Sequence, residues 1–209
     1  HEIKNPLTPM KLSAQHISRA YRDQAKNFDK ILERGVNTII DAIDSLSKTA
    51  SSFSEFARFS KPDLGNYDIP KILNECLILF ENYRNISISY NIEEHIPDGM
   101  ADLHQLKRVL INIFTNAIQS INHDDGKIEV DCKFDKSLRK IIISVKDNGC
   151  GISESTKKHL FEPNFSTKTH GSGLGLAICK RAMDHIGGEI NIDSKENEGT
   201  IVILKINTK

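Results

Sequence analysis

Apolar residues recur at alternating steps of four and three over residues 3–57, interrupted once by a polar stretch at 23–29. This heptad rhythm is typical of helices that bury one stripe against another helix. We therefore predict two long amphipathic helices joined by a short loop, a helical hairpin. The stripe consists of Ile3, Leu7, Met10, Ala14, Ile17 and Tyr21 in the first helix and of Leu32, Val36, Ile39, Ile43, Leu46, Ala50, Phe53 and Ala57 in the second.

A lone hairpin covers only part of these two stripes. Ile40, Phe56 and Phe59 add apolar surface beyond the main seam, so a second hairpin from another copy of the chain is the natural cover. We expect a homodimer held together by a four-helix bundle. The alternative is a monomer whose hairpin folds back on the downstream region.

A proline and a glycine in Ser60-Lys61-Pro62-Asp63-Leu64-Gly65-Asn66 end the heptad rhythm and indicate a domain boundary. We expect a hairpin at residues 1–60, a hinge-like linker at 61–66 and a second domain at 67–209. Helical and alternating patterns interleave in the second domain, which predicts an α/β sandwich with helices on one face of a sheet, and hence an α plus α/β fold class. The expected helices are 69–84, 102–121 and one ending near 186, and the expected strands are 86–92, 128–134, 141–145, 189–192 and 200–206.

Composition excludes several function classes. Lysine plus arginine (28) balances aspartate plus glutamate (28), so no net field draws the chain to nucleic acid or an anionic membrane. The four cysteines form no C-x-x-C pair, which argues against a zinc or dithiol site and favours reduced, buried thiols in a cytosolic protein. No apolar run reaches the roughly 20 residues that span a bilayer. Because the chain opens inside a helical pattern, we expect a fragment whose sensing or membrane segments lie upstream.

The opening run is His1-Glu2-Ile3-Lys4-Asn5-Pro6-Leu7-Thr8-Pro9. Asn5 follows His1 by one helical turn, so both side chains project on one face, away from the seam. A neutral imidazole offers a nucleophilic ring nitrogen, and a carboxylate such as that of Glu2 can take its proton. Asn5 stands where an H-E-x-x-H zinc site needs its second histidine. A zinc site or a leftover tag histidine also leaves Pro6 and Pro9 unexplained, although an interior helical proline costs about 3 kcal/mol or more.

Asn112 and Asn116 are four residues apart on the helix expected at 102–121, which opens with Asp102 and Gln105 at capping-box spacing. Two amide oxygens on one ridge can complete the shell of a Mg²⁺ held mostly by water and substrate phosphates. Taken alone, such a pair is more often a solvated helix edge.

Asp147-Asn148-Gly149-Cys150-Gly151 follows directly on an apolar strand, a usual place for ligand contacts in α/β proteins. The glycines let the backbone turn and approach a flat ligand closely. The Asp147 carboxylate can accept a hydrogen bond from the exocyclic amine of adenine, whereas the carbonyl of guanine would face it lone pair to lone pair. The prediction is ATP over GTP.

Gly171-Ser172-Gly173-Leu174-Gly175-Leu176 opens the last expected helix. Free backbone N–H groups and the helix dipole favour phosphate there. The run is neither the dinucleotide fingerprint G-x-G-x-x-G nor a G-x-x-x-x-G-K-[ST] loop, and the chain has no H-R-D motif of protein kinases. If phosphate binds at this run, a different ATP-binding fold is required.

In this order, the motifs resemble those of the histidine kinases of two-component signalling. Residues 1–9 are similar to the phosphoacceptor box, 102–119 to the asparagine box, 147–151 to the first glycine box and 171–176 to the second. Phe161-Glu162-Pro163-Asn164-Phe165 resembles the phenylalanine box, and Glu198-Gly199-Thr200 the last glycine box. The sequences of 1–9 and 165–168 resemble most those of nitrogen-regulation-type sensor kinases.

The resemblance implies a dimerisation and phosphotransfer hairpin followed by a Bergerat-type ATP-binding domain. His1 would receive the phosphoryl group, with Glu2 as base, and Asn5 would position a water for dephosphorylating a response regulator. The implied ATP and Mg²⁺ contacts are Asn112 and Asn116 for the metal, Asp147 and Thr200 for adenine, and Gly149, Gly151, Lys168, Gly171, Gly173, Leu174 and Gly175 around the nucleotide, under a lid at 148–172.

Two positions depart from the family pattern. Gln119 stands where many relatives carry a lysine or arginine near the phosphates, so Lys168 is expected to supply that charge. Asn197 replaces the first glycine of the last box. The expected function is an ATP-dependent protein-histidine kinase that passes the phosphoryl group to a response-regulator receiver domain and also acts as its phosphatase. The alternatives are an ATPase of the gyrase or chaperone class, a non-catalytic dimeric scaffold, and a protein that works chiefly as a phosphatase.

Overall fold

The computed structural model describes residues 3–57, 62–81, 83, 85–163, 165–166 and 173–209. His1, Glu2, Phe59, Lys168 and Gly171, all named by the sequence analysis, lie outside these ranges. The chain forms two compact units, one of residues 1–59 with 166–174 and one of 60–165 with 175–209.

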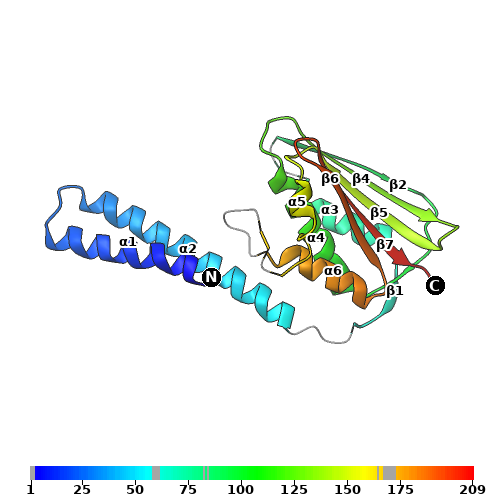
Figure 1. The fold of residues 1–209 in the computed structure, drawn as a ribbon, viewed down its shortest axis with the longest axis horizontal. Helices are drawn as coiled ribbons and strands as arrows, with labels where there is room; N and C mark the ends of the chain where they lie inside the picture. The colour runs from blue at the N-terminus through cyan, green and yellow to red at the C-terminus, as the bar shows by residue number, and fades with distance from the viewer. Residues whose placement is uncertain (1–2, 58–61, 82, 84, 164, 167–172) are drawn as a thin grey trace. The chain divides into compact units, whose positions relative to one another are not determined.

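The first unit contains the predicted helical hairpin, drawn in blue to cyan in Figure 1. Helix α1 (Lys4–Arg22) and helix α2 (Phe28–Ala57) lie side by side, joined by the predicted polar break. The Tyr21 and Phe28 rings, with centroids 5.8 Å apart, pack across the start and end of the loop. Since α1 begins at Lys4, Pro6 falls in its first turn, where backbone N–H groups have no acceptor within the helix and proline is tolerated. Pro9 lies inside the helix.

Much of the heptad stripe stays exposed on a single hairpin. Among the described residues of the hairpin, the buried apolar ones are Ala20 and Ala42, which do not belong to the predicted stripe and are small enough for the two helices to approach closely. Tyr21 is 72% exposed and Ile43 48% exposed, although both belong to the stripe. The hairpin as a single chain therefore leaves apolar surface uncovered.

The second unit is built on a five-stranded sheet with the order β2-β4-β5-β7-β6. Strand β2 pairs parallel with β4, and the other neighbours pair antiparallel, which puts β5 in the centre as its apolar sequence predicts. A separate two-stranded ribbon pairs β1 (Gly65–Tyr67) with β3 (Gly99–Ala101). The strands of the large sheet are β2 (Ile86–Ile92), β4 (Gly126–Asp135), β5 (Lys140–Asp147), β6 (Glu189–Lys195) and β7 (Gly199–Asn207).

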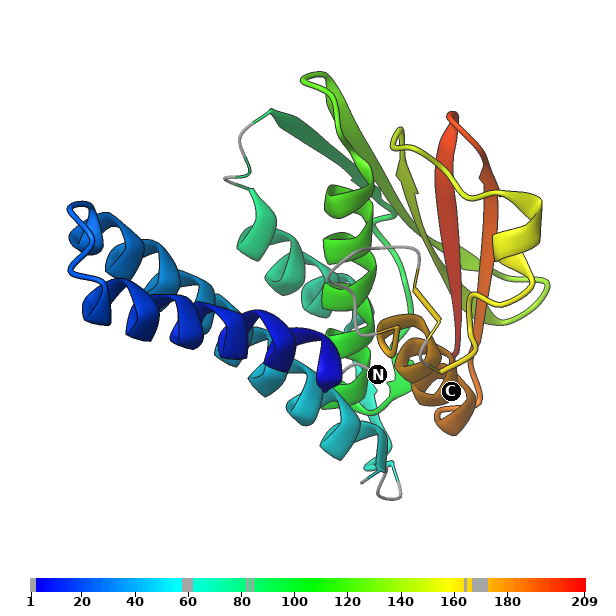
Figure 2. The same ribbon diagram turned by 60° about the vertical axis from the view of Figure 1, so that its left-hand side comes forward.

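Three helices, α3 (Ile69–Leu77), α4 (Leu103–Ser120) and α6 (Gly175–His185), cover one face of this sheet, as Figures 1 and 2 show. Alternate residues of β4 and β5 are buried against them, and Phe114 of α4 is fully buried. The predicted α plus α/β fold class, with helices on one face of a sheet, is confirmed. None of the helices in the described ranges combines the length and the apolar character that crossing a membrane requires.

The structure differs from the predicted elements in the helix at 69–84, in the unpredicted short helix α5 (Glu154–Lys157), and in strands β1 and β3. The helix predicted at 69–84 ends at Leu77 and continues only as a 3₁₀ turn, Ile78–Phe80, in which Phe80 is buried while Ile78 and Leu79 are exposed. Strands β1 and β3 were not predicted, since three residues are too few for an alternating pattern.

Part of the predicted linker is attached to the second unit. The Asp63 N–H donates to Asp102 Oδ2 at 3.0 Å, and Gly65 and Asn66 lie in β1, paired with Ala101 and Met100 of β3.

Candidate functional site

Helix α4 begins at a side-chain cap, as predicted from Asp102 and Gln105. Asp102 Oδ1 accepts from the Gln105 N–H at 3.0 Å, and its Oδ2 accepts from the Asp63 N–H. Burial acts to raise the pKa of Asp102, but the N–H donors of Gln105, Asp63 and His104 together hold this pKa below its ordinary value. The Gln105 side chain departs from a capping box, because its amide donates to the Asp102 carboxylate at 3.2 Å. The cap fixes where α4 starts and thereby the face that its asparagines occupy.

Asn112 and Asn116 are half-buried on one ridge of α4, as their spacing predicts. Asn112 Oδ1 lies 3.6 Å from the position that a Cβ on Gly175 would occupy, so this amide oxygen faces the first residue of α6. An amide oxygen beside a helix N-terminus suits a magnesium ion that is also held by phosphates. Gln119, three residues on from Asn116, is exposed.

Metal sites of another kind are not indicated. In the ranges that the structure describes, no group of three or more His, Cys, Asp and Glu side chains could hold a metal ion. A magnesium ion at Asn112 and Asn116 would therefore depend on amide oxygens, water and phosphates, which is the ligand set expected from the sequence.

Asp147 ends the central strand β5 and is buried, 5% exposed. Its Oδ1 accepts two hydrogen bonds at 2.9 Å, one from the Gly149 N–H and one from the Ser120 hydroxyl. Gly149 is also buried, and a Cβ there would lie 2.1 Å from Ser120 Oγ, so no other residue fits. The carboxylate and the glycine turn after it thus pack directly on the end of α4.

Thr200 stands opposite Asp147 on the neighbouring strand β7 and is buried. The Ser194 hydroxyl lies 2.9 Å from Thr200 Oγ1 and 2.8 Å from the Gly199 carbonyl oxygen, to which it donates. A carboxylate and two hydroxyls thus line the ends of β5, β6 and β7. These groups can hold an ordered water and the polar edge of a ligand.

The turn after Asp147 meets the β6–β7 hairpin closely. Gly151 has a φ of 65°, and a Cβ on it would lie 1.9 Å from the Lys195 carbonyl oxygen. Asn197, where the family pattern has a glycine, adopts a φ of 62° and donates its N–H to the Cys150 carbonyl oxygen at 2.7 Å. Asparagine is among the few residues that adopt this left-handed conformation readily. The departure at Asn197 therefore leaves the backbone path intact.

Helix α6 packs against α4 through Cys179, whose thiol donates to the Val109 carbonyl oxygen at 3.9 Å. Burial raises the pKa of Cys179 to about 12, so this thiol stays protonated and unreactive. Gly173 and Leu174 directly precede α6; Gly173 has a φ of 60° and Leu174 is buried. Of the cysteines, Cys150 is exposed, and the expectation that all four are buried is wrong.

The predicted site residues divide into three sets. The second unit brings Asn112 close to Gly175, and Asp147 to Gly149 and Thr200. Asn5 is exposed on α1 of the first unit, to which Gly173 and Leu174 also belong. His1, Glu2, Lys168 and Gly171 lie outside the described residues.

Sequence reasoning missed two polar residues that contact the site, Ser120 and Ser194. Ser120 is four residues from Asn116, a helical spacing that could have marked it as a neighbour. Nothing in the sequence pairs Ser194 with Thr200, because their contact depends on the register of β6 against β7.

Comparison with known proteins identifies the family. A family model described as histidine kinase-, DNA gyrase B-, and HSP90-like ATPase matches residues 101–209, just over half of the chain. The chain belongs to this family. The nitrogen regulation protein NtrY of Azorhizobium caulinodans is 29% identical over 214 residues, which cover 99% of this chain and 27% of that protein.

Solved structures agree with this assignment. The catalytic domain of histidine kinase ThkA, in a nucleotide-free form, is 32% identical, with a TM-score of 0.62 over 70% of this chain and 96% of that one. ThkA solved in complex with the response regulator protein TrrA is 26% identical, with a TM-score of 0.75 over 100% of this chain and 59% of that one. The resemblance to histidine kinases is thereby confirmed. The chain spans about a quarter to a half of the length of the curated relatives that it matches.

Proposed function

We propose that this chain is the catalytic portion of a dimeric sensor histidine kinase that binds magnesium ATP and transfers its γ-phosphoryl group to His1. The observation that carries the proposal is the combination, in one unit, of a buried carboxylate at the end of β5 with an amide oxygen that faces the first residue of α6. The first suits a nucleobase and the second a phosphate chain with its metal. The family assignment supports the same ligand.

Asp147 is the proposed contact for the base. Its carboxylate accepts from the 6-amino group of adenine, and Thr200 on the opposite strand completes the contact through a water. Guanine presents a carbonyl at the same position and is repelled by an anionic carboxylate. Gly149 and Gly151 carry no side chain, so a flat base can lie close to the backbone of the turn.

Asn112 and Asn116 are the proposed magnesium ligands at the phosphate end. A bound magnesium ion neutralises phosphate charge and holds the chain of phosphates in line. The backbone N–H groups at Gly173, Leu174 and Gly175 add hydrogen-bond donors at the start of α6. Because Gln119 carries no charge, Lys168 and Gly171 of the lid are proposed as the remaining phosphate contacts.

His1 is the proposed acceptor of the phosphoryl group. In the transfer, the bond between the γ-phosphorus and the β,γ-bridging oxygen breaks, ADP leaves, and a phosphorus–nitrogen bond forms to the imidazole, whose proton passes to Glu2. Asn5, exposed on α1, is proposed to position a water that removes the phosphoryl group from a response regulator. The aspartate of that regulator's receiver domain is the onward acceptor.

The exposed stripe of the hairpin supports a homodimer. Leu7, Val36, Ile43 and Phe53 are all exposed on a single hairpin, and a second copy packed against them would bury four stripes in one bundle. A domain boundary at 61–66, a cytoplasmic location and a nitrogen-regulation-type subfamily are part of the same proposal.

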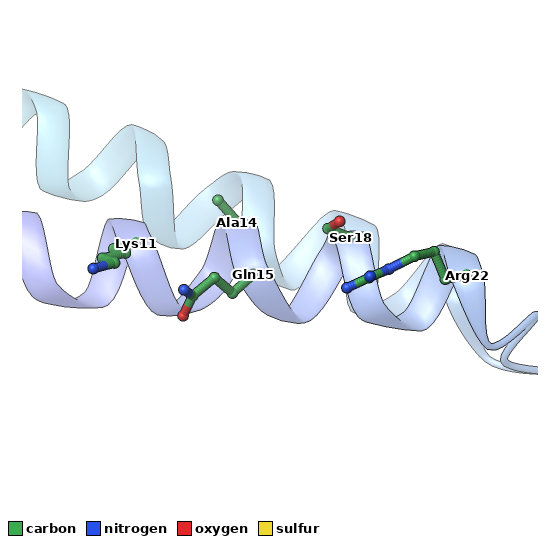
Figure 3. Close-up of a pocket in the computed structure, with 5 residues that line it drawn as sticks. All are labelled: Lys11, Ala14, Gln15, Ser18 and Arg22. Atoms are coloured by element: carbon green, nitrogen blue, oxygen red, sulfur yellow. The ribbon is translucent and has the colours of Figure 1, made fainter.

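A shallow groove on α1 is the proposed contact for the regulator. It is lined by Lys11, Ala14, Gln15, Ser18 and Arg22, all from one helix, as Figure 3 shows. The two cationic and two polar side chains suit a surface that carries carboxylates, whereas Ala14 belongs to the stripe proposed for the dimer. The structure of ThkA with a response regulator supports a partner of this kind.

The test is incubation of the chain with labelled ATP and magnesium. We expect incorporated label that survives base, is lost in acid and disappears in His1→Gln. Asp147→Asn should abolish labelling while leaving the circular dichroism spectrum intact. Transfer to a receiver domain should follow, and Asn5→Ala should slow regulator dephosphorylation without slowing labelling.

Other outcomes would contradict the proposal in distinct ways. ATP hydrolysis with no protein label indicates an ATPase of the gyrase or chaperone class. Binding of no nucleotide indicates a scaffold. Label that persists in His1→Gln indicates another acceptor.

A further inference from the structure

Ser120 is the last residue of α4 and is half-buried against the turn that follows β5. Its Oγ lies 2.7 Å from the Ala117 carbonyl oxygen and 2.9 Å from Asp147 Oδ1. The hydroxyl has a single hydrogen, which it can donate to only one of these oxygens at a time. An anionic carboxylate is the stronger acceptor of the two, because charge-assisted hydrogen bonds are stronger than neutral ones.

The backbone holds the same contact in register. The Cys150 N–H donates to the Ser120 carbonyl oxygen at 2.9 Å, and the place of a Gly149 Cβ is taken by Ser120, with Oγ at 2.1 Å and the Ser120 Cβ at 2.7 Å. Ser120 therefore contacts the turn through both its main chain and its hydroxyl. These contacts hold the end of the asparagine-bearing helix against the turn that follows Asp147.

Both described donors to Asp147 are directed at the same carboxylate oxygen. The Gly149 N–H and the Ser120 hydroxyl each approach Oδ1 at 2.9 Å. Two donors on one oxygen fix the rotation of the carboxylate about its χ2 bond. An anion in a fixed orientation accepts from an amine and repels a carbonyl oxygen.

We propose that Ser120 is a positioning residue for base recognition: it holds the Asp147 carboxylate in the orientation that reads the 6-amino group of adenine. The proposal rests on the nucleotide binding proposed above and deepens it. Ser120 does not touch the ligand in this scheme and acts through Asp147. Its removal therefore changes how strongly the chain senses the amino group, beyond any change in overall affinity.

The test is a double-mutant cycle across protein and ligand. Binding of ATP and of purine riboside triphosphate, which lacks the 6-amino group, is measured by calorimetry with magnesium for wild type and Ser120→Ala. Wild type should bind ATP about 10-fold or more tightly than the analogue, the size expected for a hydrogen bond to a charged group. Ser120→Ala should bind ATP roughly 5-fold more weakly and prefer it over the analogue by only about 2-fold.

Two further variants keep the test decisive. Ser144→Ala removes another half-buried serine, three residues before Asp147 on β5, and should leave both affinities unchanged. Ser120→Thr keeps the hydroxyl, so it should keep the preference for the 6-amino group even if the added methyl group weakens both ligands equally.

The outcomes separate this inference from the proposed function. Equal losses for both ligands in Ser120→Ala would mean that Ser120 only supports the fold, and would overturn the inference while the nucleotide site stands. Loss of the preference in Ser120→Thr would overturn it as well. If wild type binds neither ligand, the proposed function fails and the inference fails with it.

Discussion

The two units of the chain treat apolar residues in opposite ways. In the sheet unit, large side chains such as Phe114, Leu110 and Ile143 are fully buried within one chain. In the hairpin, the buried apolar residues of the described part are two alanines, while Tyr21 and Phe53 stay largely exposed. Apolar residues therefore form a buried core within one unit and an exposed apolar surface on the other. The sheet unit thus has a core of its own, whereas a single hairpin leaves apolar side chains exposed, as the proposed dimer requires.

The helix starts show the same contrast. Helices α3 and α4 each begin with an aspartate, Asp68 and Asp102, that accepts a backbone N–H at 3.0 Å. Helix α1 begins after Ile3, whose side chain cannot accept a hydrogen bond. Local signals thus define the helices of the sheet unit, while the hairpin helices depend more on packing.

The largest expected loss of stability comes from a substitution in the core of the sheet unit. Phe114→Ala should cost about 3–5 kcal/mol of stability, because it empties a fully buried site. The loss, measured by denaturant unfolding followed by circular dichroism, should be the same at all protein concentrations. Phe53→Ala removes the same ring from an exposed position of the hairpin. Equal losses for the two variants would contradict the contrast.

A charge on the stripe should separate the proposed dimer. Ile43→Asp should raise the dissociation constant at least about 100-fold, since an unpaired charge would be buried in the bundle. Sedimentation equilibrium at several concentrations measures this. Asn37→Asp adds the same charge at an exposed position off the stripe and should leave the dimer unchanged. A dimer that persists in Ile43→Asp would show that the stripe is not the interface.

The smallest effect concerns the cap of α4. Asp102→Ala should lower stability at neutral pH by about 1 kcal/mol, the usual value of an N-cap. The pKa of Asp102 is lowered in the folded state, so its contribution is present above the ordinary value of 3.8 and is lost as the pH falls below it. Thermal melts of the variant and wild type should therefore differ at pH 7 and converge below about pH 3.8. Asp98→Ala, at an exposed position nearby, should show no such gap.

Features that depend on local periodicity were predictable from the sequence. The heptads predicted α1 and α2, and alternation predicted β2 at its observed bounds. The asparagine ridge and the glycine turn after Asp147 could be predicted because each lies within a few residues of chain. Strands β1 and β3 could not, because they are stabilised by each other and not by their own pattern. Ser194 was missed for the same reason, since its partner Thr200 lies on another strand. Helical spacing from Asn116 could have marked Ser120, but not its contact with Asp147, which is 27 residues away.

The hydrogen bond from the Asp63 N–H to Asp102 shortens the tether between the two units. Helix α2 ends at Ala57, so whatever path residues 58–61 take, six residues of chain reach no farther than about 20 Å when fully extended. The covalent chain therefore limits how far Asp63 can lie from the end of α2. Because the tether ends on the cap of α4, a pull along the chain acts on the first turn of the helix that carries Asn112 and Asn116.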